Sequence, residues 1–337
     1  MQPLVDGLRP AYFRAGGSES DKVFLSLEQE PVTTPAGYES VLYARHWDAM
    51  QHFIKAHQLK FIFTLNNGPS SRDGHGAWRA GQAQQLMAYA AARGDRIDLW
   101  EMGNELNVFF YLYGPGSSVS PAQYLQDMSL ARTLAQEKTP NSRIAGQASA
   151  IVPALGEPLA PLFGFMEPYL RSAGHLTDVV LFHYYPQQSR RGPVATRRAS
   201  PSRMLNPDYL DELGYWTLRM KALRDQYAPG KPVWIGETGG AQFGGEPGIS
   251  DAYLGGLWWL DELGLAARSG VEVVVRQTLS GSNYGLIDDK TLVPRPDYWN
   301  SWLWKRLMGQ EVFAFHLVTN PVRRLRSGLP DSLGDSN

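Results

Sequence analysis

Short apolar runs rich in β-branched residues alternate along this chain with stretches of helical pattern, and this alternation constrains the fold most. The runs are residues 11–17, 60–66, 97–105, 142–149, 178–185, 232–238 and 271–279. Between them, residues 42–57, 82–93, 161–174 and 209–227 have the pattern of helices. Strand–helix alternation predicts a parallel sheet covered by helices, and continuous apolar strands agree because parallel strands are buried on both faces.

Each apolar run ends in polar or glycine-rich residues, as in GNELN (103–107) and GETGG (236–240). In (β/α)8 barrels the C-terminal ends of the strands carry the active site. A doubly wound sheet would gather such residues at one crevice and would usually show a phosphate-binding glycine loop, a motif that this sequence lacks. We therefore predict an α/β fold of the (β/α)8 TIM-barrel type.

The pattern supplies seven strands, whereas a closed barrel of this type has eight. Because the later strands and helices are all present, we expect the missing strand to be the first one, before residue 11. Residues 316–337 are poor in apolar side chains and are expected to form a disordered tail. The predicted organisation is one N-terminally truncated barrel over residues 1–315, followed by that tail, as in a fragment of a longer protein.

Composition excludes several kinds of site. The chain has no cysteine, which rules out disulfides, thiolate nucleophiles and iron–sulfur clusters. A net charge of −1 gives no overall field that would recruit nucleic acid, and no apolar run is long enough to cross a bilayer. We find neither a metal-ligand spacing nor the GxSxG motif of serine hydrolases. Aromatic residues make up 12% of the chain, which suits sugar-binding clefts or simply a large core.

Two glutamates, Glu105 and Glu237, end strands that lie three apart in the predicted order, so they face each other across the barrel mouth. Two carboxyl groups about 5 Å apart are what a retaining glycosidase needs, one as acid/base and one as nucleophile. Asn104, beside the first glutamate, is suited to hydrogen-bond a sugar 2-hydroxyl. The alternative is that both glutamates form structural ion pairs.

Several motifs, in order and spacing, resemble those of the heparanase and β-glucuronidase family, glycoside hydrolase family 79, within a clan of retaining (β/α)8 glycosidases. The likeness extends over residues 7–309. The motifs are WEMGNELN (100–107), HYYPQQ (183–188), LNPDYLDEL (205–213), VWIGETGGAQFGG (233–245) and the stretch 251–289.

This resemblance implies a role for each matching residue. Glu105 is the implied acid/base next to Asn104, Glu237 the nucleophile, and Tyr184 the tyrosine that hydrogen-bonds the nucleophile. Gly244, Gly245 and Tyr284 match residues that hold the carboxylate of a uronic acid, while Gln147 and Gln277 match polar residues that line the cleft. From the residues themselves, the arginine-rich loop 186–203 places Arg190 and Arg191 where they could attract an anionic polysaccharide, or could form a solvated loop.

The implied activity is retaining hydrolysis of β-linked glucuronic acid in glycans, endo or exo, with no cofactor and no metal. The implied partner is a glucuronic-acid-containing oligo- or polysaccharide, with neither nucleic acid nor a membrane segment involved. The family implies export, although the first residues lack a signal-peptide pattern. This chain departs from heparanase at Leu106 and Ser149, and we expect it to lack the C-terminal β-sandwich of the family. Two alternatives stay open, a non-catalytic glycan-binding relative and an inactive fragment.

Overall fold

A computed structural model of the chain describes residues 2–313. The tail expected over 316–337 lies outside these described residues. The chain forms two compact units, and each is described by itself. The first unit contains the residues up to Tyr185 together with 220–238 and 273–277. The second unit contains 186–219, 239–272 and the residues from 278 onward.

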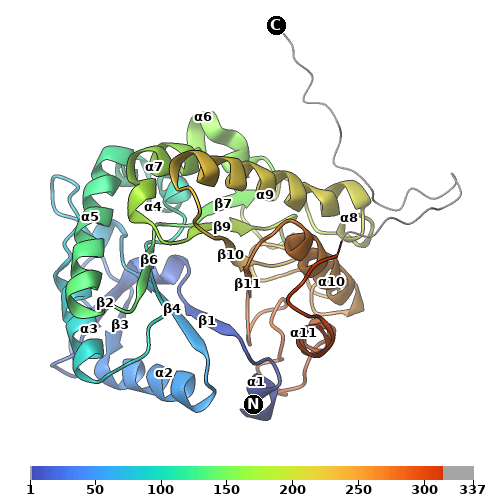
Figure 1. Ribbon diagram of the computed structural model, residues 1–337, viewed down its shortest axis with the longest axis horizontal. Helices are drawn as coiled ribbons and strands as arrows, with labels where there is room; N and C mark the ends of the chain where they lie inside the picture. Colours follow the sequence, from blue (N-terminus) through green and yellow to red (C-terminus); the bar gives the residue numbers. More distant parts are fainter. Residues whose placement is uncertain (1, 314–337) are drawn as a thin grey trace, which may run out of the picture. The chain divides into compact units, whose positions relative to one another are not determined.

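Parallel strands form the wall of a barrel in the first unit (Figure 1). One hydrogen-bonded sheet has the order β1 (Tyr12–Ala15), β4 (Lys60–Leu65), β5 (Leu99–Met102) and β6 (Arg143–Ala145). The other has the order β11 (Val273–Arg276), β10 (Val233–Thr238), β9 (Val180–Tyr184) and β7 (Ser149–Val152), with β8 (Leu155–Gly156) antiparallel to β7. All seven expected runs contain strand, and the run predicted over 142–149 is divided into β6 and the start of β7.

Helices follow the strands along the chain, as the alternation predicts. Figure 1 shows several of them outside the strands of the first unit. The helices are α1 (Gln2–Asp6), α2 (Ala44–Ala56), α3 (Gly81–Ala92), α4 (Phe109–Tyr113), α5 (Pro121–Lys138), α6 (Ala160–Phe163), α7 (Met166–Ala173), α8 (Pro201–Met204), α9 (Pro207–Tyr227), α10 (Tyr253–Arg268) and α11 (Pro296–Leu307). The single helix predicted over 161–174 is interrupted between α6 and α7.

Two features of the first unit do not follow from the alternating pattern. Strands β2 (Val23–Ser26) and β3 (Ser40–Tyr43) form a separate parallel pair between β1 and α2. A single turn of 3-10 helix, η1 (Ser18–Lys22), connects the end of β1 to β2. This turn matters for the site because it directly follows the C-terminal end of a barrel strand.

Side chains inside the barrel form layers, because successive residues of a strand point to opposite faces. One layer is apolar and contains Ile62, Leu99, Leu181 and Trp234, with Tyr12 packed against them. Two residues further along the same strands the inward positions are polar, and this next layer contains Arg14, Thr64, Glu101 and His183. The change from apolar to polar marks the level at which the site begins.

The barrel wall is not hydrogen-bonded all the way around. Within residues 2–313 no ladder joins β1 to β11, although Cα atoms of the two strands come within 8 Å of each other. The ring of Tyr12 lies beside this seam, with its centroid 4.9 Å from that of Trp234. Side-chain packing therefore links the two sheets at a position where backbone hydrogen bonds do not.

Candidate active site

The two glutamates singled out from the sequence lie together in the first unit. Glu105 directly follows Asn104 after β5, and Glu237 is the penultimate residue of β10. A carboxyl oxygen of Glu105 lies within 4.8 Å of a carboxyl oxygen of Glu237. Glu105 is only 6% exposed, so the pair lies at the polar end of the barrel interior and not on an open surface.

Unusual backbone positions the two glutamates. Glu105 has φ 49° and ψ 48°, a left-handed conformation that costs a non-glycine residue free energy and that recurs at functional sites. Gly103, two residues earlier, has φ 78°, and a Cβ there would lie 2.7 Å from the Leu106 side chain. On the other strand, the pairing of β10 with β9 shifts by one residue between Ile235 and Glu237. Such bulges redirect side chains next to active sites.

Two side chains hold the Glu237 carboxylate. Arg14 donates from Nη1 to Oε2 at 2.9 Å, and the Tyr185 hydroxyl donates to Oε1 at 2.5 Å. Burial acts to raise the pKa of Glu237, but the charges of His183 and Arg14 and these hydrogen bonds outweigh it, so the pKa is lowered. Glu237 is therefore ionised at neutral pH, as a nucleophile must be.

Arg14 connects both glutamate-bearing strands. Besides Glu237, its Nε donates to Glu101 at 2.7 Å and its Nη2 to the Asn104 side-chain oxygen at 2.9 Å. Its side chain is 5% exposed. Burial lowers the pKa of Arg14, but the charges of Glu101 and Glu237 more than reverse this and raise it. A planar guanidinium can serve three acceptors in this way, whereas a lysine ammonium could not match the geometry.

The residues around Glu105 hold its loop. His183 Nδ1 lies 2.8 Å from Glu105 Oε1. Asn104 donates weakly to Ser18 Oγ at 3.4 Å, in the turn η1. In the same turn, burial raises the pKa of Asp21 to about 8, against hydrogen bonds from the backbone N–H groups of Asn67 and Asn104. Asp21 is therefore largely protonated at neutral pH and adds little negative charge near the pair.

The structure corrects the tyrosine chosen by family resemblance. Tyr185, and not Tyr184, donates the hydrogen bond to Glu237. His183 and Tyr185 project to the same side of the chain because they are two residues apart, while Tyr184 points to the other face. Tyr184 instead pairs through its backbone with Thr238, whose hydroxyl donates to the Tyr184 carbonyl. Because Tyr184 and Tyr185 are adjacent, the sequence does not show which of them faces the nucleophile.

The two glutamines expected to line the cleft have different surroundings. Gln147 is fully buried; its Oε1 accepts from Leu106 N at 3.1 Å and its Nε2 donates to Ser149 at 2.8 Å. Its amide therefore supports the loop after Glu105, and its predicted contact with a sugar stays a prediction. Gln277 follows β11, is partly exposed, and donates from its backbone N to Thr238 O at 2.8 Å.

The remaining predicted binding residues belong to the second unit. Gly244 and Gly245 have φ 84° and 79°, and the Gly245 N–H already donates to the Ala241 carbonyl. This contact occupies one of the two amides expected to hold a carboxylate. Tyr284 lies next to them, since a Cβ on Gly245 would be 2.7 Å from its backbone nitrogen.

The two arginines of the loop are held by contacts within the second unit. Arg190 pairs with the buried Glu246 at 2.8 Å. Arg191 donates to the Gly245 carbonyl at 2.6 Å and to the Asn283 side chain at 2.8 Å. Glu246 compensates the charge of Arg190, whereas the partners of Arg191 are neutral. The predicted attraction to an anionic polymer is therefore weaker at Arg190 than at Arg191.

Sequence reasoning missed Arg14, Glu101 and Thr64, which complete the polar layer below the glutamates. Thr64 donates to Glu101 Oε2 at 2.6 Å. A signal was present, because a charged residue within an apolar barrel strand, as in AYFRAGG and DLWEMG, needs a buried partner. The pattern predicts that each such charged residue has a buried partner, but it does not identify that partner.

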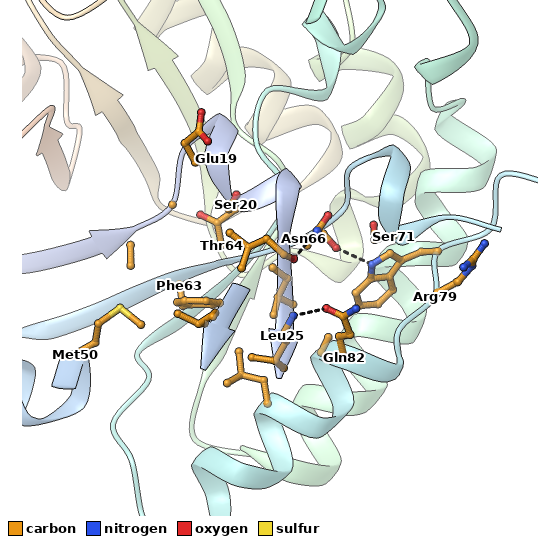
Figure 2. Close-up of a pocket in the computed structure, with 18 residues that line it drawn as sticks. Glu19, Ser20, Leu25, Met50, Phe63, Thr64, Asn66, Ser71, Arg79 and Gln82 are labelled. Carbon is orange, nitrogen blue, oxygen red and sulfur yellow. Dashed lines mark hydrogen bonds between the residues drawn. The ribbon is translucent and has the colours of Figure 1, made fainter. Parts of the chain in front are cut away.

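A cavity of about 220 Å³ lies apart from the two glutamates (Figure 2). It is lined mainly by apolar side chains of β2, β4 and α3, such as Leu25, Phe63 and Leu86. Polar groups at its wall bond to one another, since Gln82 accepts from Leu25 N and Trp78 donates to Asn66 O. Neither Glu105 nor Glu237 lines it, so this cavity is not the site of the predicted chemistry.

Among the described residues one group, Glu105, His183 and Glu237, offers three ligand atoms close enough to hold a metal ion. In the structure these atoms bond to protein groups instead, because Glu237 accepts from Arg14 and Tyr185, and Glu105 contacts His183. Within residues 2–313, no helix has both the length and the apolar character needed to span a bilayer.

Solved structures of similar fold include glycosidases. The family 51 arabinofuranosidase from Xanthomonas axonopodis pv. citri aligns with TM-score 0.64 and 14% identity, covering 90% of this chain and 65% of its own. A 4-O-α-L-rhamnosyl-β-D-glucuronidase from Fusarium oxysporum 12S aligns with TM-score 0.61 and 15% identity, covering 90% and 63%. At these identities the likeness shows the fold alone, and it confirms the predicted (β/α)8 class.

Residues 2–264 match the N-terminal domain of glycosyl hydrolase family 79, and the chain belongs to this family. Rat heparanase is 30% identical over 97% of this chain and 66% of its own length. Heparanase-like protein 1 of Arabidopsis thaliana is 30% identical over 96% and 60%. Human inactive heparanase-2 is 30% identical over 86% and 46%. The chain thus spans less than two thirds of the length of these relatives.

Proposed function

We propose that this chain carries the catalytic barrel of a retaining glycoside hydrolase that cleaves β-linked glucuronic acid in glycans. Glu237 is the nucleophile and Glu105 the acid/base. The observation that carries this proposal is the approach of the two carboxyl groups to within 4.8 Å. Inverting enzymes separate theirs by about 6.5–9.5 Å to admit a water molecule, so the short distance supports retention.

The proposed reaction has two steps. Glu237 attacks the anomeric carbon and forms a C–O bond as the glycosidic bond breaks, while Glu105 gives its proton to the leaving oxygen. Water then attacks the anomeric carbon, Glu105 takes the proton of that water, and the bond to Glu237 breaks. The lowered pKa of Glu237 supports its part, because an ionised carboxylate is a far stronger nucleophile than a protonated one.

The uronic acid specificity rests on the family and on the second unit. The three relatives described above carry the name heparanase, one of them as inactive heparanase-2, and a structural neighbour is named a β-D-glucuronidase. We propose that Arg191, Tyr284 and the N–H of Gly244 bind the substrate carboxylate. Arg191 supports this, because its Nη2 lies 3.7 Å from where a Cβ on Gly244 would be, so a cation lies beside the positive-φ glycine.

Covalent trapping tests the proposal. An activated 2-fluoro β-glucuronide should attach one glucuronyl group to the peptide that contains Glu237, detected by mass spectrometry. Glu237→Gln should lose both the label and at least 10⁴-fold of turnover while it keeps binding, because only the nucleophile's charge is lost. Glu272→Gln, at an exposed glutamate, is the matched control and should behave as wild type. Labelling at another residue, or an inverted product, would rule out these roles.

A second candidate is a glycan-binding relative without activity. One observation favours it, namely the 30% identity to human inactive heparanase-2. It predicts that a glucuronide oligosaccharide binds in calorimetry, with neither turnover nor trapping. If the purified chain neither binds nor cleaves, it is inactive by itself, in keeping with its covering less than two thirds of its relatives.

A further inference from the structure

His183 is placed between two carboxylates in a layer without solvent access. Its side chain and that of Glu101 are both 0% exposed. Nδ1 lies 2.8 Å from Glu105 Oε1, and Nε2 lies 4.0 Å from Glu101 Oε1. Among the described residues neither Nε2 nor Glu101 Oε1 has a hydrogen-bond partner, so two buried polar atoms face each other across a short gap.

The protonation of Nε2 decides whether this arrangement is favourable. With a lone pair on Nε2, a nitrogen lone pair would face a carboxylate oxygen in a dry layer, which is repulsive. With a proton on Nε2, the positive end of that N–H bond lies about 4 Å from the Glu101 carboxylate, and the dry surroundings strengthen this attraction. Gly236 leaves the room for the ring, because a Cβ there would lie 3.3 Å from Nε2.

The charges around this cluster favour a positively charged His183 ring, with a proton on both nitrogens. Arg14 of β1 is a cation, and Glu101 of β5 and Glu237 of β10 are anions. Asp21 of η1 is mostly protonated. Thr64 of β4 and Tyr185, the residue after β9, are neutral. Arg143 of β6 lies one layer lower, stacked on the Trp234 ring at 4.6 Å. If Glu105 is protonated, one more cation makes the buried cluster neutral, and a charge imbalance there is costly.

We propose that His183 is held as an imidazolium between Glu101 and Glu105, and that it is the positioning residue that directs the acid proton. This inference rests on the proposed function. By donating Nδ1–H to Oε1 of Glu105, the imidazolium leaves Oε2 as the oxygen that carries the transferable proton. When Glu105 gives that proton to the leaving oxygen, the new carboxylate lies 2.8 Å from a positive ring.

Nuclear magnetic resonance of the resting protein tests the charge state without any need for activity. In protein labelled with ¹⁵N in its 7 histidines, both ring nitrogens of His183 should carry a proton at pH 7.5. Loss of its signals in His183→Asn assigns them, and the exposed His75 is the internal reference for a ring in solvent. A single protonated nitrogen on His183 at this pH would overturn the proposal, whether or not the chain is a glycosidase.

Kinetics tests the role in proton transfer. Asparagine can keep a donor near Glu105 Oε1 without the positive charge, so in His183→Asn the acid should hold its proton more tightly. The alkaline limb of the kcat/KM profile on an aryl β-glucuronide should therefore move up by about 1 pH unit or more. Glu101→Gln removes the counterion that holds the proton of His183, and the resulting loss of the ring's charge should move the limb in the same direction. His57→Asn, at a buried ring paired with Asp6 at 2.9 Å, is the control and should leave the limb in place.

The outcomes separate the two ideas. A slower His183→Asn enzyme with an unmoved limb would mean a purely structural role and would refute the proposal. An inactive wild type would refute the proposed function, and the spectrum would still decide the state of His183. If His183→Asn fails to fold, the wild-type spectrum and Glu101→Gln decide the matter.

Discussion

At the scale of single residues, the hydrogen bonds to Glu237 control when it is ionised. A carboxyl group whose pKa is lowered keeps its charge until the pH falls below its ordinary value, 4.5 for glutamate. We therefore expect the acid limb of kcat/KM to lie below pH 4.5, with activity lost as the pH falls through the pKa of Glu237.

Replacing the tyrosine that bonds Glu237 tests this cause. Tyr185→Phe removes a hydrogen bond that lowers the pKa, so the acid limb should move to higher pH, measured by the pH profile of aryl glucuronide hydrolysis. Tyr184→Phe is the matched control, since its ring points to the other face of β9, and its acid limb should coincide with that of wild type. A shift in Tyr184→Phe alone would restore the assignment made from the sequence.

The acid role of Glu105 can be tested by the dependence of kcat/KM on the leaving group. Glu105→Gln cannot donate a proton, so substrates with poor leaving groups should lose about 10²–10⁴-fold in kcat/KM. An activated aryl glucuronide barely needs protonation and should lose much less in its first step. Comparing a nitrophenyl glucuronide with an alkyl glucuronide measures this, and equal losses on both would contradict the acid assignment.

At the scale of elements, the turn between β5 and Glu105 is built for one backbone path. Gly103 has positive φ, and a Cβ there would clash with Leu106 and Asn67 at 2.7 and 2.8 Å. Gly103→Ala should cost about 1–3 kcal/mol in the free energy of unfolding and should reduce kcat, because the clash displaces the following Glu105. Urea unfolding and turnover measure both effects.

A second glycine with positive φ is the control for that substitution. Gly94 has φ 61°, and no heavy atom lies within 4 Å of the place that a Cβ would take, so Gly94→Ala bears only the conformational cost, about 1 kcal/mol. Its turnover should stay that of wild type. Equal losses of stability and activity in both variants would show that the close contacts at Gly103 do not matter.

Sequence patterns predict elements well here and side-chain partners poorly. Period and strand ends placed Glu105 and Glu237 on opposite strands, because the C-terminal ends of parallel strands meet at one mouth. The strand predicted over 142–149 breaks into β6 and β7, since its residues 146–148 join neither ladder, and hydropathy cannot show this. Which buried acceptors Arg14 serves depends on three strands at once, and no local pattern contains that information.

At the scale of the whole molecule, the seam between β1 and β11 separates two hydrogen-bonded sheets. Strand β9 is bonded on both sides, to β7 and β10, whereas β1 and β11 are each bonded on one side among residues 2–313. Hydrogen–deuterium exchange followed by mass spectrometry should therefore show the slowest exchange in β9 and faster exchange in β1 and β11. Uniform protection of all these strands would mean that the seam is closed in solution.

Arg14, with its side chain only 5% exposed, shares one guanidinium among Glu101, Glu237 and Asn104. The site thus contains its own counterions. At 0.1 M, dissolved salt screens the interaction between exposed charges that are more than about 10 Å apart. It screens buried pairs far less. The rate of the chemical step should consequently not depend on ionic strength. Any effect of salt on this protein should arise in the initial binding of an anionic polymer to its surface.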